Sequence, residues 1–156
     1  MDLYSIFEAA EATGIGTFVR ESNWIFPMIQ CIHLLSIALL GGAVLTVDLS
    51  LIGVALRPQQ PSLVERSARP WLNLSVTVVV ITGVLMGFAE ALKLYDRQAF
   101  FVKMLVLGIA ILFTYALRNP LAHRLEPATV PARLVATVSI GLWLVVAIAG
   151  RWIGFS

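Results

Sequence analysis

A histidine and a lysine have the clearest capacity for chemistry in this sequence, because each lies inside a long apolar run. His33 lies in the first such run and Lys103 lies near the start of the third. A charged side chain in hydrocarbon costs roughly 2.5–3.5 kcal/mol on insertion scales, so its presence there needs a reason. An imidazole is a standard axial ligand of haem iron. An amine that loses its proton on burial could supply the second ligand.

Three more charged residues belong with this pair if successive helices run antiparallel. Glu90 and Arg151 lie at the ends of apolar runs, and Arg20 precedes the first run. On this arrangement they share one membrane face with His33, which lies about 13 Å beyond Trp24 at 1.5 Å per residue. We therefore predict one cofactor site near this face, with two metal ligands (His33 and Lys103) and three surrounding charges (Arg20, Arg151 and Glu90).

Each of these residues also has a purely structural explanation. His33 could be hydrogen-bonded to a neighbouring helix, and Lys103 could extend its ammonium group to the interface. Glu90 could pair with Lys93 or Lys103, and Arg151 could be an interfacial anchor.

Asp48 is a separate case, because it lies nearer the opposite membrane face. On a helical wheel it shares a side with His33, about 22 Å away along the axis. That side must face the interior of the bundle, where Arg118 or Asn73 could satisfy the carboxylate.

The elements that hold these residues are four apolar runs. The 156-residue chain is 59% apolar and only 13% charged, whereas a soluble domain is about 25% charged. A span needs about 20 residues, and backbone groups in lipid must bond internally, so the runs are helices. Short connections make successive helices antiparallel. We predict an all-α fold, a single-domain (1–156) integral membrane four-helix antiparallel bundle with spans at 25–56, 71–92, 99–117 and 134–153.

The connections contain smaller predicted elements. Residues 2–12 have an apolar face and predict an interfacial helix on the membrane, ended by Gly14 and Gly16. Residues 57–70 contain three prolines and a Ser62–Glu65 capping box, which predicts a short surface helix. Residues 93–98 predict a polar turn, and Pro131 is placed to start the fourth span.

Several function classes lack support in the sequence. No basic stripe with interleaved aromatic residues is present, so nucleic-acid binding is not expected. No nucleophile–base pair, phosphate loop or zinc spacing occurs. The lone cysteine, Cys31, excludes an intrachain disulfide.

Short motifs resemble a family of small bacterial four-helix membrane proteins without an assigned function. In that family an arginine commonly lies two residues after the aspartate that corresponds to Asp48. In this chain that position is Ser50. The resemblance covers residues 15–120 and rests on Arg20–Pro27, His33, Gly41-Gly42, Val47–Gly53, Thr82-Gly83 and Phe100–Lys103.

A more distant resemblance links residues 32–42 and 103–107 to two characterised groups. These are the membrane domain of CopD-type copper-resistance proteins and the HemJ-type protoporphyrinogen oxidases. In the second group a first-helix histidine and a third-helix lysine are associated with haem b, and His33 and Lys103 match those positions. A tryptophan commonly precedes the first-helix glycine in these groups. In this chain Leu40 occupies that position, before Gly41.

These observations predict a haem b-binding membrane redox protein, acting in electron transfer or as an oxidase. Arg20 or Arg151 would pair with the propionates, and Gly41 or Gly83 would make room for the macrocycle. The bilayer is the expected environment, and a redox partner or a larger membrane complex is an expected partner.

Two alternatives remain open. The first is copper handling, because soft ligands suit Cu(I), although Cys31 and His33 are about 200° apart on the wheel. The second is a noncatalytic subunit of a larger membrane complex. The candidate copper ligands are Met28, Cys31, His33, Met86 and Met104.

The Lys and Arg distribution predicts the orientation in a bacterial inner membrane. Six such residues fall on one side and five on the other, and the richer side is expected in the cytoplasm. Both termini would then be periplasmic. The six are Arg57, Arg66, Arg69, Arg118, Arg124 and Arg133, and the five are Arg20, Lys93, Arg97, Lys103 and Arg151.

Overall fold

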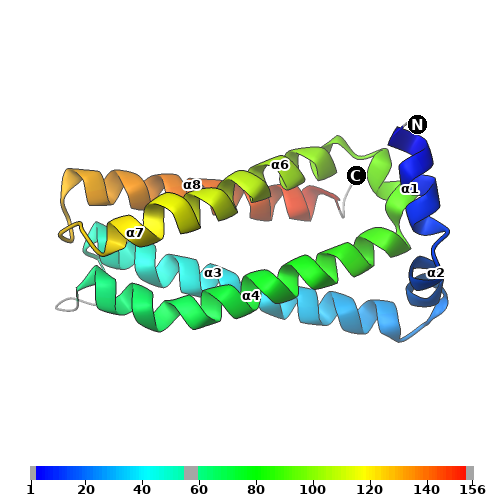
Figure 1. Ribbon diagram of the computed structural model, residues 1–156, viewed down its shortest axis with the longest axis horizontal. Coiled ribbons are helices and arrows are strands. Elements are labelled where there is room, and N and C mark those ends of the chain that lie inside the picture. The colour runs from blue at the N-terminus through cyan, green and yellow to red at the C-terminus, as the bar shows by residue number, and fades with distance from the viewer. Residues whose placement is uncertain (1–2, 55–59, 154–156) are drawn as a thin grey trace.

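The computed structural model describes residues 3–54 and 60–153, and this part of the chain is helical with short connections and no strand. Figure 1 shows the helices running back and forth along one long axis. In chain order they are α1 (Leu3–Glu11), α2 (Gly14–Glu21), α3 (Ile25–Ile52), α4 (Pro61–Ala89), α5 (Ala91–Tyr95), α6 (Gln98–Phe113), the π-helix η1 (Thr114–Arg118), α7 (Asn119–Ala122) and α8 (Val130–Ile153).

Four of these segments are long and apolar enough to cross a membrane, which confirms the predicted all-α membrane bundle. They are α3, α4, the continuous segment from α6 to α7, and α8. Many of their large apolar side chains are exposed at the outer surface of the bundle, as a lipid environment requires.

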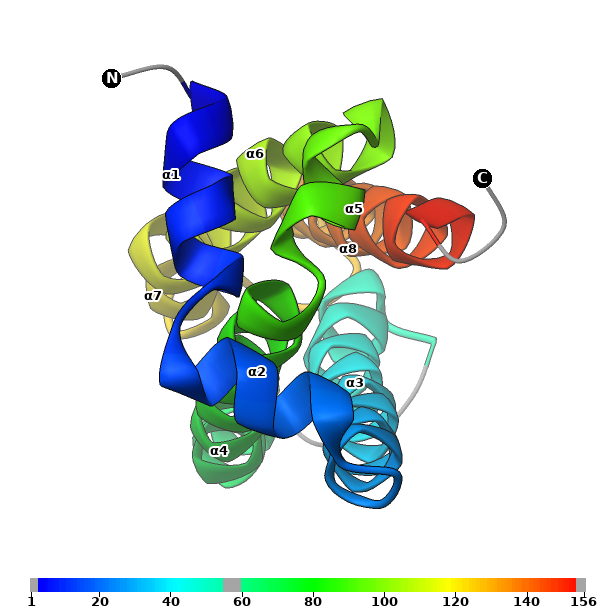
Figure 2. The same cartoon turned by 90° about the vertical axis from the view of Figure 1, so that its right-hand side faces the viewer.

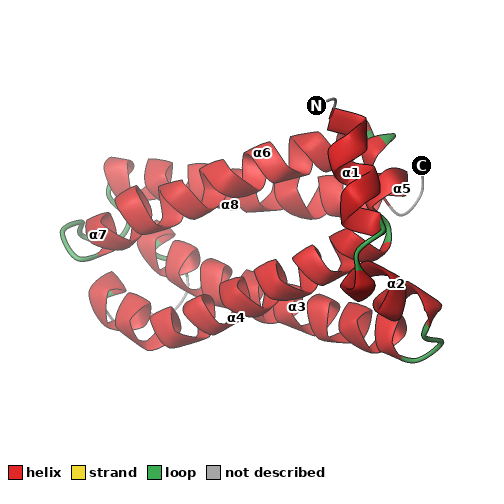
Figure 3. Cartoon of the chain, turned by 45° about the vertical axis from the view of Figure 1, so that its right-hand side comes forward, coloured by secondary structure: helices red, strands yellow, loops and turns green. Residues whose placement is uncertain are grey.

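The spans associate as two pairs that meet along one seam. Helix α3 packs along α4, α6 packs along α8, and α3 also contacts α8. Figure 3 shows the two pairs as separate layers. The short helices α1, α2 and α5 lie across one end of the bundle, here named the α2 end (Figure 2). The opposite end, which holds α7, is named the α7 end.

The N-terminal segment forms two short helices where we predicted one helix followed by glycine breakers. The prediction of a helix within residues 2–12 is confirmed by α1, with residue 2 outside the described range. Gly14 and Gly16 do not simply end it, because Thr13 caps a second helix and accepts a hydrogen bond from the Gly16 N–H at 3.2 Å. Gly16 serves close packing instead, since a Cβ there would lie 2.6 Å from the Phe88 carbonyl oxygen of α4.

The prediction of a separate surface helix before Pro70 is wrong. Helix α4 runs without interruption from Pro61, with Pro70 inside it. Pro61 lies in the first turn, where its missing N–H has no intrahelical partner to lose. A proline inside a spanning helix is tolerated where neighbouring groups satisfy the freed backbone. Residues 55–59, with the predicted loop residues Arg57 and Pro58, lie outside the described part of the chain.

The ends of the other spans differ from prediction by a few residues. Helix α3 ends at Ile52 because Gly53 takes a positive φ of 81° and donates its N–H to the carbonyl oxygens of Leu49 and Ser50. The third span continues past residue 117 through η1 and α7. Part of the predicted turn at 93–98 is helical, as α5. Pro131 occupies the first turn of α8, as predicted.

Candidate functional site

His33 lies in the interior of the bundle, between α3 and α4. It is 9% exposed, and its Nδ1 lies 2.7 Å from the Thr82 hydroxyl. Gly83 is the residue after Thr82 in α4. A Cβ added at Gly83 would lie 3.5 Å from the Cε1 atom of the His33 imidazole. The absence of a side chain at Gly83 thus lets one edge of the ring lie close to the α4 backbone.

The partners of Thr82 determine which nitrogen of His33 carries the proton. The Thr82 hydroxyl donates to the Val78 carbonyl oxygen at 2.6 Å. A hydroxyl has one proton to donate, so Thr82 accepts the hydrogen bond from Nδ1 of His33. The neutral imidazole is therefore protonated at Nδ1 and has a lone pair at Nε2. No hydrogen-bond partner of Nε2 occurs within residues 3–54 and 60–153.

Lys103 lies on the inner side of α6 and is partly buried. The end of its side chain crosses Gly150 of α8, where an added Cβ would lie 3.5 Å from Nζ. No carboxylate pairs with this ammonium group in the described part of the chain. No hydrogen bond or ion pair joins Lys103 to His33 in the described part of the chain. The imidazole belongs to the α3–α4 pair and the amine to the α6–α8 pair, and both lie toward the α2 end.

The three remaining predicted site residues lie at the same end of the bundle but further out. Arg20 pairs with Glu11 at 2.9 Å, and Glu90 pairs with Lys93 at 3.1 Å. Arg20 and Glu90 both line a surface pocket of about 220 Å³. Arg151 is exposed at the end of α8, directly after the glycine that Lys103 crosses. These three residues, here named the charged rim, lie toward the surface at the α2 end, and none makes a hydrogen bond to His33.

A second polar centre, which we name the Asp48–Arg118 pair, lies toward the α7 end. Both side chains are fully buried, with Nε of Arg118 2.8 Å from Oδ1 of Asp48. Arg118 also donates to the Asn119 side-chain oxygen at 2.9 Å and to the Val44 carbonyl oxygen at 2.7 Å. Of the two partners considered for Asp48, Arg118 is the actual one.

The π-helix η1 ends at Arg118, and sequence reasoning missed it. One extra residue in a helical turn changes the direction of every side chain that follows, and such turns recur at functional positions. The hydroxyl of Ser50, at the position where the related pattern has arginine, is buried with no partner in the described part of the chain. Helix α3 has no Lys or Arg of its own to pair with Asp48. Arg118 of the third span supplies that positive charge instead.

A third polar cluster at the α7 end was also missed. Glu65 is 1% exposed and pairs with Arg69 at 2.8 Å and with Nε2 of His123 at 2.9 Å. The i,i+4 spacing of Glu65 and Arg69 is a signal for this pair, but the proline at position 70 had suggested a helix end. His123 belongs to this cluster and lies far from His33.

The candidate copper ligands differ in how far they are buried, and Met86 is half-buried. Met28, Cys31 and Met104 are exposed at the outer surface of their helices, whereas His33 is buried. Within residues 3–54 and 60–153 there is no group of three His, Cys, Asp or Glu side chains placed to hold a metal ion. The side-chain arrangement therefore gives no specific support to copper handling.

Comparison with known protein families gives a match over most of the chain. Residues 6–156 match the model of a family described as a family of unknown function, DUF6644. No curated protein and no solved structure matches the chain. The family match agrees with the predicted likeness to an uncharacterised family, while the likeness to copper-resistance domains and protoporphyrinogen oxidases receives no support from it.

Proposed function

We infer a function for this chain, which belongs to the DUF6644 family, from its own side chains. We propose that it binds haem b between α3 and α6 near the α2 end and acts as a membrane redox protein, in electron transfer or as an oxidase. His33 would hold the iron through Nε2, and Lys103 is the candidate second ligand.

The observation that carries this proposal is the hydrogen bond between His33 and Thr82. Histidines that bind metals almost always donate their other N–H to a neighbouring acceptor, which fixes the ring and its protonation. Thr82 does this for Nδ1 of His33 at 2.7 Å and leaves the Nε2 lone pair available. A structural histidine would also need an acceptor for Nδ1, so the feature that favours a ligand is that Nε2 has no partner within the described residues.

The surrounding residues fit the donor preferences of haem iron. Imidazole nitrogen is a standard axial donor, and the amine of Lys103 has no competing carboxylate in the described residues. Gly83 beside His33 and Gly150 beside Lys103 keep the neighbouring helix surfaces free of bulky side chains. Bound haem would supply one-electron chemistry, and the chain would supply its orientation and its exclusion from water.

The propionate groups of such a haem would lie toward the charged rim. Arg151 and Arg20 are the two cations of that rim, and Arg20 already pairs with Glu11. We further propose that the α2 end faces the periplasm of a bacterial inner membrane, because more Lys and Arg residues belong to the α7 end. One of these, Arg57, lies outside the described residues.

The direct test is the absorption spectrum of the purified protein. We expect protein from haem-replete cells to show a Soret band, and its pyridine adduct to show the b-type spectrum. A folded but colourless preparation would contradict the proposal. Stoichiometric copper in that colourless sample would instead favour copper handling, and no metal at all would favour a noncatalytic subunit.

Replacing Lys103 with methionine tests the second ligand. A methionine ligand opposite histidine raises the potential of haem iron. The Lys103→Met variant is therefore expected to have a higher midpoint potential and an altered spectrum. Lys93→Met is the matched control, because Lys93 lies at the same end but is exposed and pairs with Glu90. An unchanged potential in Lys103→Met would show that Lys103 is not a ligand.

A further inference from the structure

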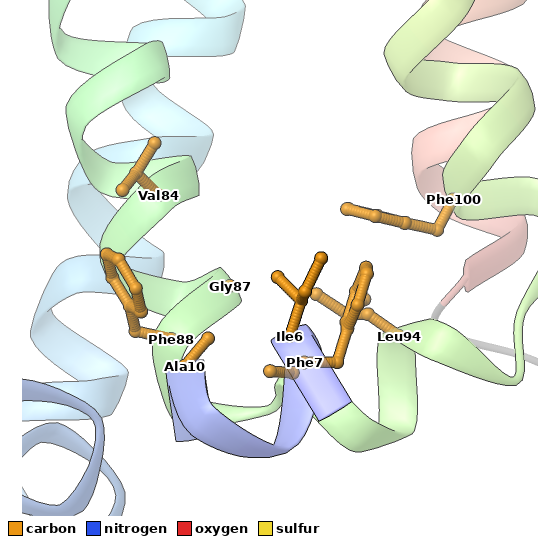
Figure 4. Close-up of a pocket in the computed structure, with 9 residues that line it drawn as sticks. Ile6, Phe7, Ala10, Val84, Gly87, Phe88, Leu94 and Phe100 are labelled. Carbon is orange, nitrogen blue, oxygen red and sulfur yellow. The ribbon is translucent and has the colours of Figure 1, made fainter. Parts of the chain in front are cut away.

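An apolar pocket of about 220 Å³ opens at the α2 end, between α4 and α6 (Figure 4). It is separate from the proposed haem site, since neither His33 nor Lys103 lines it. All its lining side chains are apolar, and they come from four helices. Six of them are Ile6 and Phe7 of α1, Val84 and Gly87 of α4, Leu94 of α5 and Phe100 of α6.

The short helix α1 forms one wall of this pocket and is firmly held there. Phe7 packs edge-on against Tyr95, with ring centroids 5.5 Å apart, and against Phe100 at 6.2 Å. The Glu11 carboxylate accepts a hydrogen bond from the Leu92 N–H at 2.7 Å. These contacts join α1 to both α5 and α6, so the pocket is part of the folded structure.

The size and lining of the pocket indicate a hydrocarbon chain as its occupant. Pockets for whole small molecules are about 300–1,000 Å³, so this one holds only part of a ligand. A polar group placed here would find no hydrogen-bond partner among the lining side chains, which is unfavourable for a buried group. A water molecule needs two to four polar partners and would not be satisfied either. In a bilayer, lipid chains are the abundant molecules that meet these conditions.

A positive charge beside the pocket indicates which headgroup the chain carries. Arg97 lies one turn from two lining residues, because its N–H bonds the Leu94 carbonyl at 3.1 Å and its carbonyl accepts the Phe100 N–H at 3.0 Å. Arg97 makes no ion pair within the described residues, and the neighbouring Asp96 is exposed. Lys93, one turn earlier, adds a second basic group that is shared with Glu90. Basic residues at a membrane surface favour anionic lipids.

We propose that this pocket binds one acyl chain of an anionic phospholipid, with the phosphate of the headgroup beside Arg97. The pocket supplies the apolar contacts, and Arg97 supplies the preference for negative charge. The proposal does not rest on haem binding, since none of the residues that line the pocket belongs to the proposed haem site.

The test measures lipids that remain bound to the detergent-purified full-length protein, by native mass spectrometry. The protein is offered phosphatidylglycerol and phosphatidylcholine at equal concentration. We expect one retained lipid per chain and a preference of about fivefold for phosphatidylglycerol, as one basic residue near a membrane surface provides. Retention of neither lipid, or retention without headgroup preference, would overturn the proposal.

Two variants separate the roles of chain and headgroup. Gly87→Leu fills the pocket, because a Cβ there meets nothing within 4 Å, and is expected to abolish retention. Gly141→Leu is the matched control, since a Cβ at Gly141 of α8 is equally free and lies outside the pocket. Arg97→Gln is expected to keep a bound lipid but lose the preference.

A further variant keeps the test decisive if Gly87→Leu fails to fold. Val84→Phe narrows the same pocket from a residue that is 51% exposed, so its larger side chain has room outside the core. We expect it to reduce retention as well. Wild-type retention by a folded pocket-filling variant would show that the lipid binds elsewhere, and the proposal would be wrong.

Discussion

Replacing Arg118 with leucine is expected to lower the free energy of unfolding by about 3–5 kcal/mol. The Asp48–Arg118 pair is fully buried, so the variant leaves a carboxylate in the interior without its counter-charge. It also removes the donors to Asn119 and to the Val44 carbonyl. The quantity to measure is the unfolding free energy in detergent micelles, from a denaturant titration followed by circular dichroism.

The double replacement of Asp48 and Arg118 by leucine separates the effect of an orphaned charge from the value of the pair. Removing both charges is expected to recover most of the lost stability, since apolar replacements of a buried pair are often neutral or better. Arg20→Leu is the control, because the Arg20–Glu11 pair is partly exposed and such pairs contribute about 0–1 kcal/mol. An Arg118→Leu variant as stable as the control would contradict the prediction.

Replacing His33 with alanine is expected to abolish the Soret band completely. The variant removes the one imidazole that lies buried in a span with an unprotonated nitrogen available, and His123 pairs with Glu65 at the other end of the bundle. His123→Ala is therefore the matched control and is expected to keep the band. The measurement is the haem-to-protein ratio of each purified variant.

Two further variants test the geometry behind that loss. Adding imidazole to His33→Gly is expected to restore part of the band, because the free ligand can enter the space that the side chain leaves. Thr82→Val removes the acceptor for Nδ1 and is expected to weaken haem binding about 10- to 100-fold, as loss of such a supporting hydrogen bond does. A His33→Ala variant with a full Soret band would mean that another residue holds the haem.

Much of the fold could be predicted from the sequence, because lipid leaves the backbone few choices. Four apolar runs must be helices, and short connections must make them antiparallel. The same argument placed His33 and Lys103 at one end of the bundle. It could not give their contacts, since the hydrogen bond to Thr82 and the packing against Gly150 depend on how each helix is rotated.

The errors arose where a local signal competed with tertiary packing. Pro70 is a helix breaker in isolation, but α4 continues through it with buried apolar side chains on both sides, at Val64, Ala68 and Leu72. The choice between Arg118 and Asn73 as the partner of Asp48 depends on the unpredicted π-helix before Arg118. In the structure the Asn73 side chain accepts instead from the Tyr115 hydroxyl at 2.6 Å.

The order in which the chain is made sets the earliest time at which the Asp48–Arg118 pair can form. Asp48 is synthesised 70 residues before Arg118. At about 5–20 residues per second, the delay is roughly 4 to 14 s. Over that time the chain is extended through the end of the first span, the whole of the second and most of the third. Asp48 lies close to the end of α3, so it can remain at the hydrated edge of the bilayer until the third span arrives. Arrival of that span would then form the pair before the fourth span, α8, has been made.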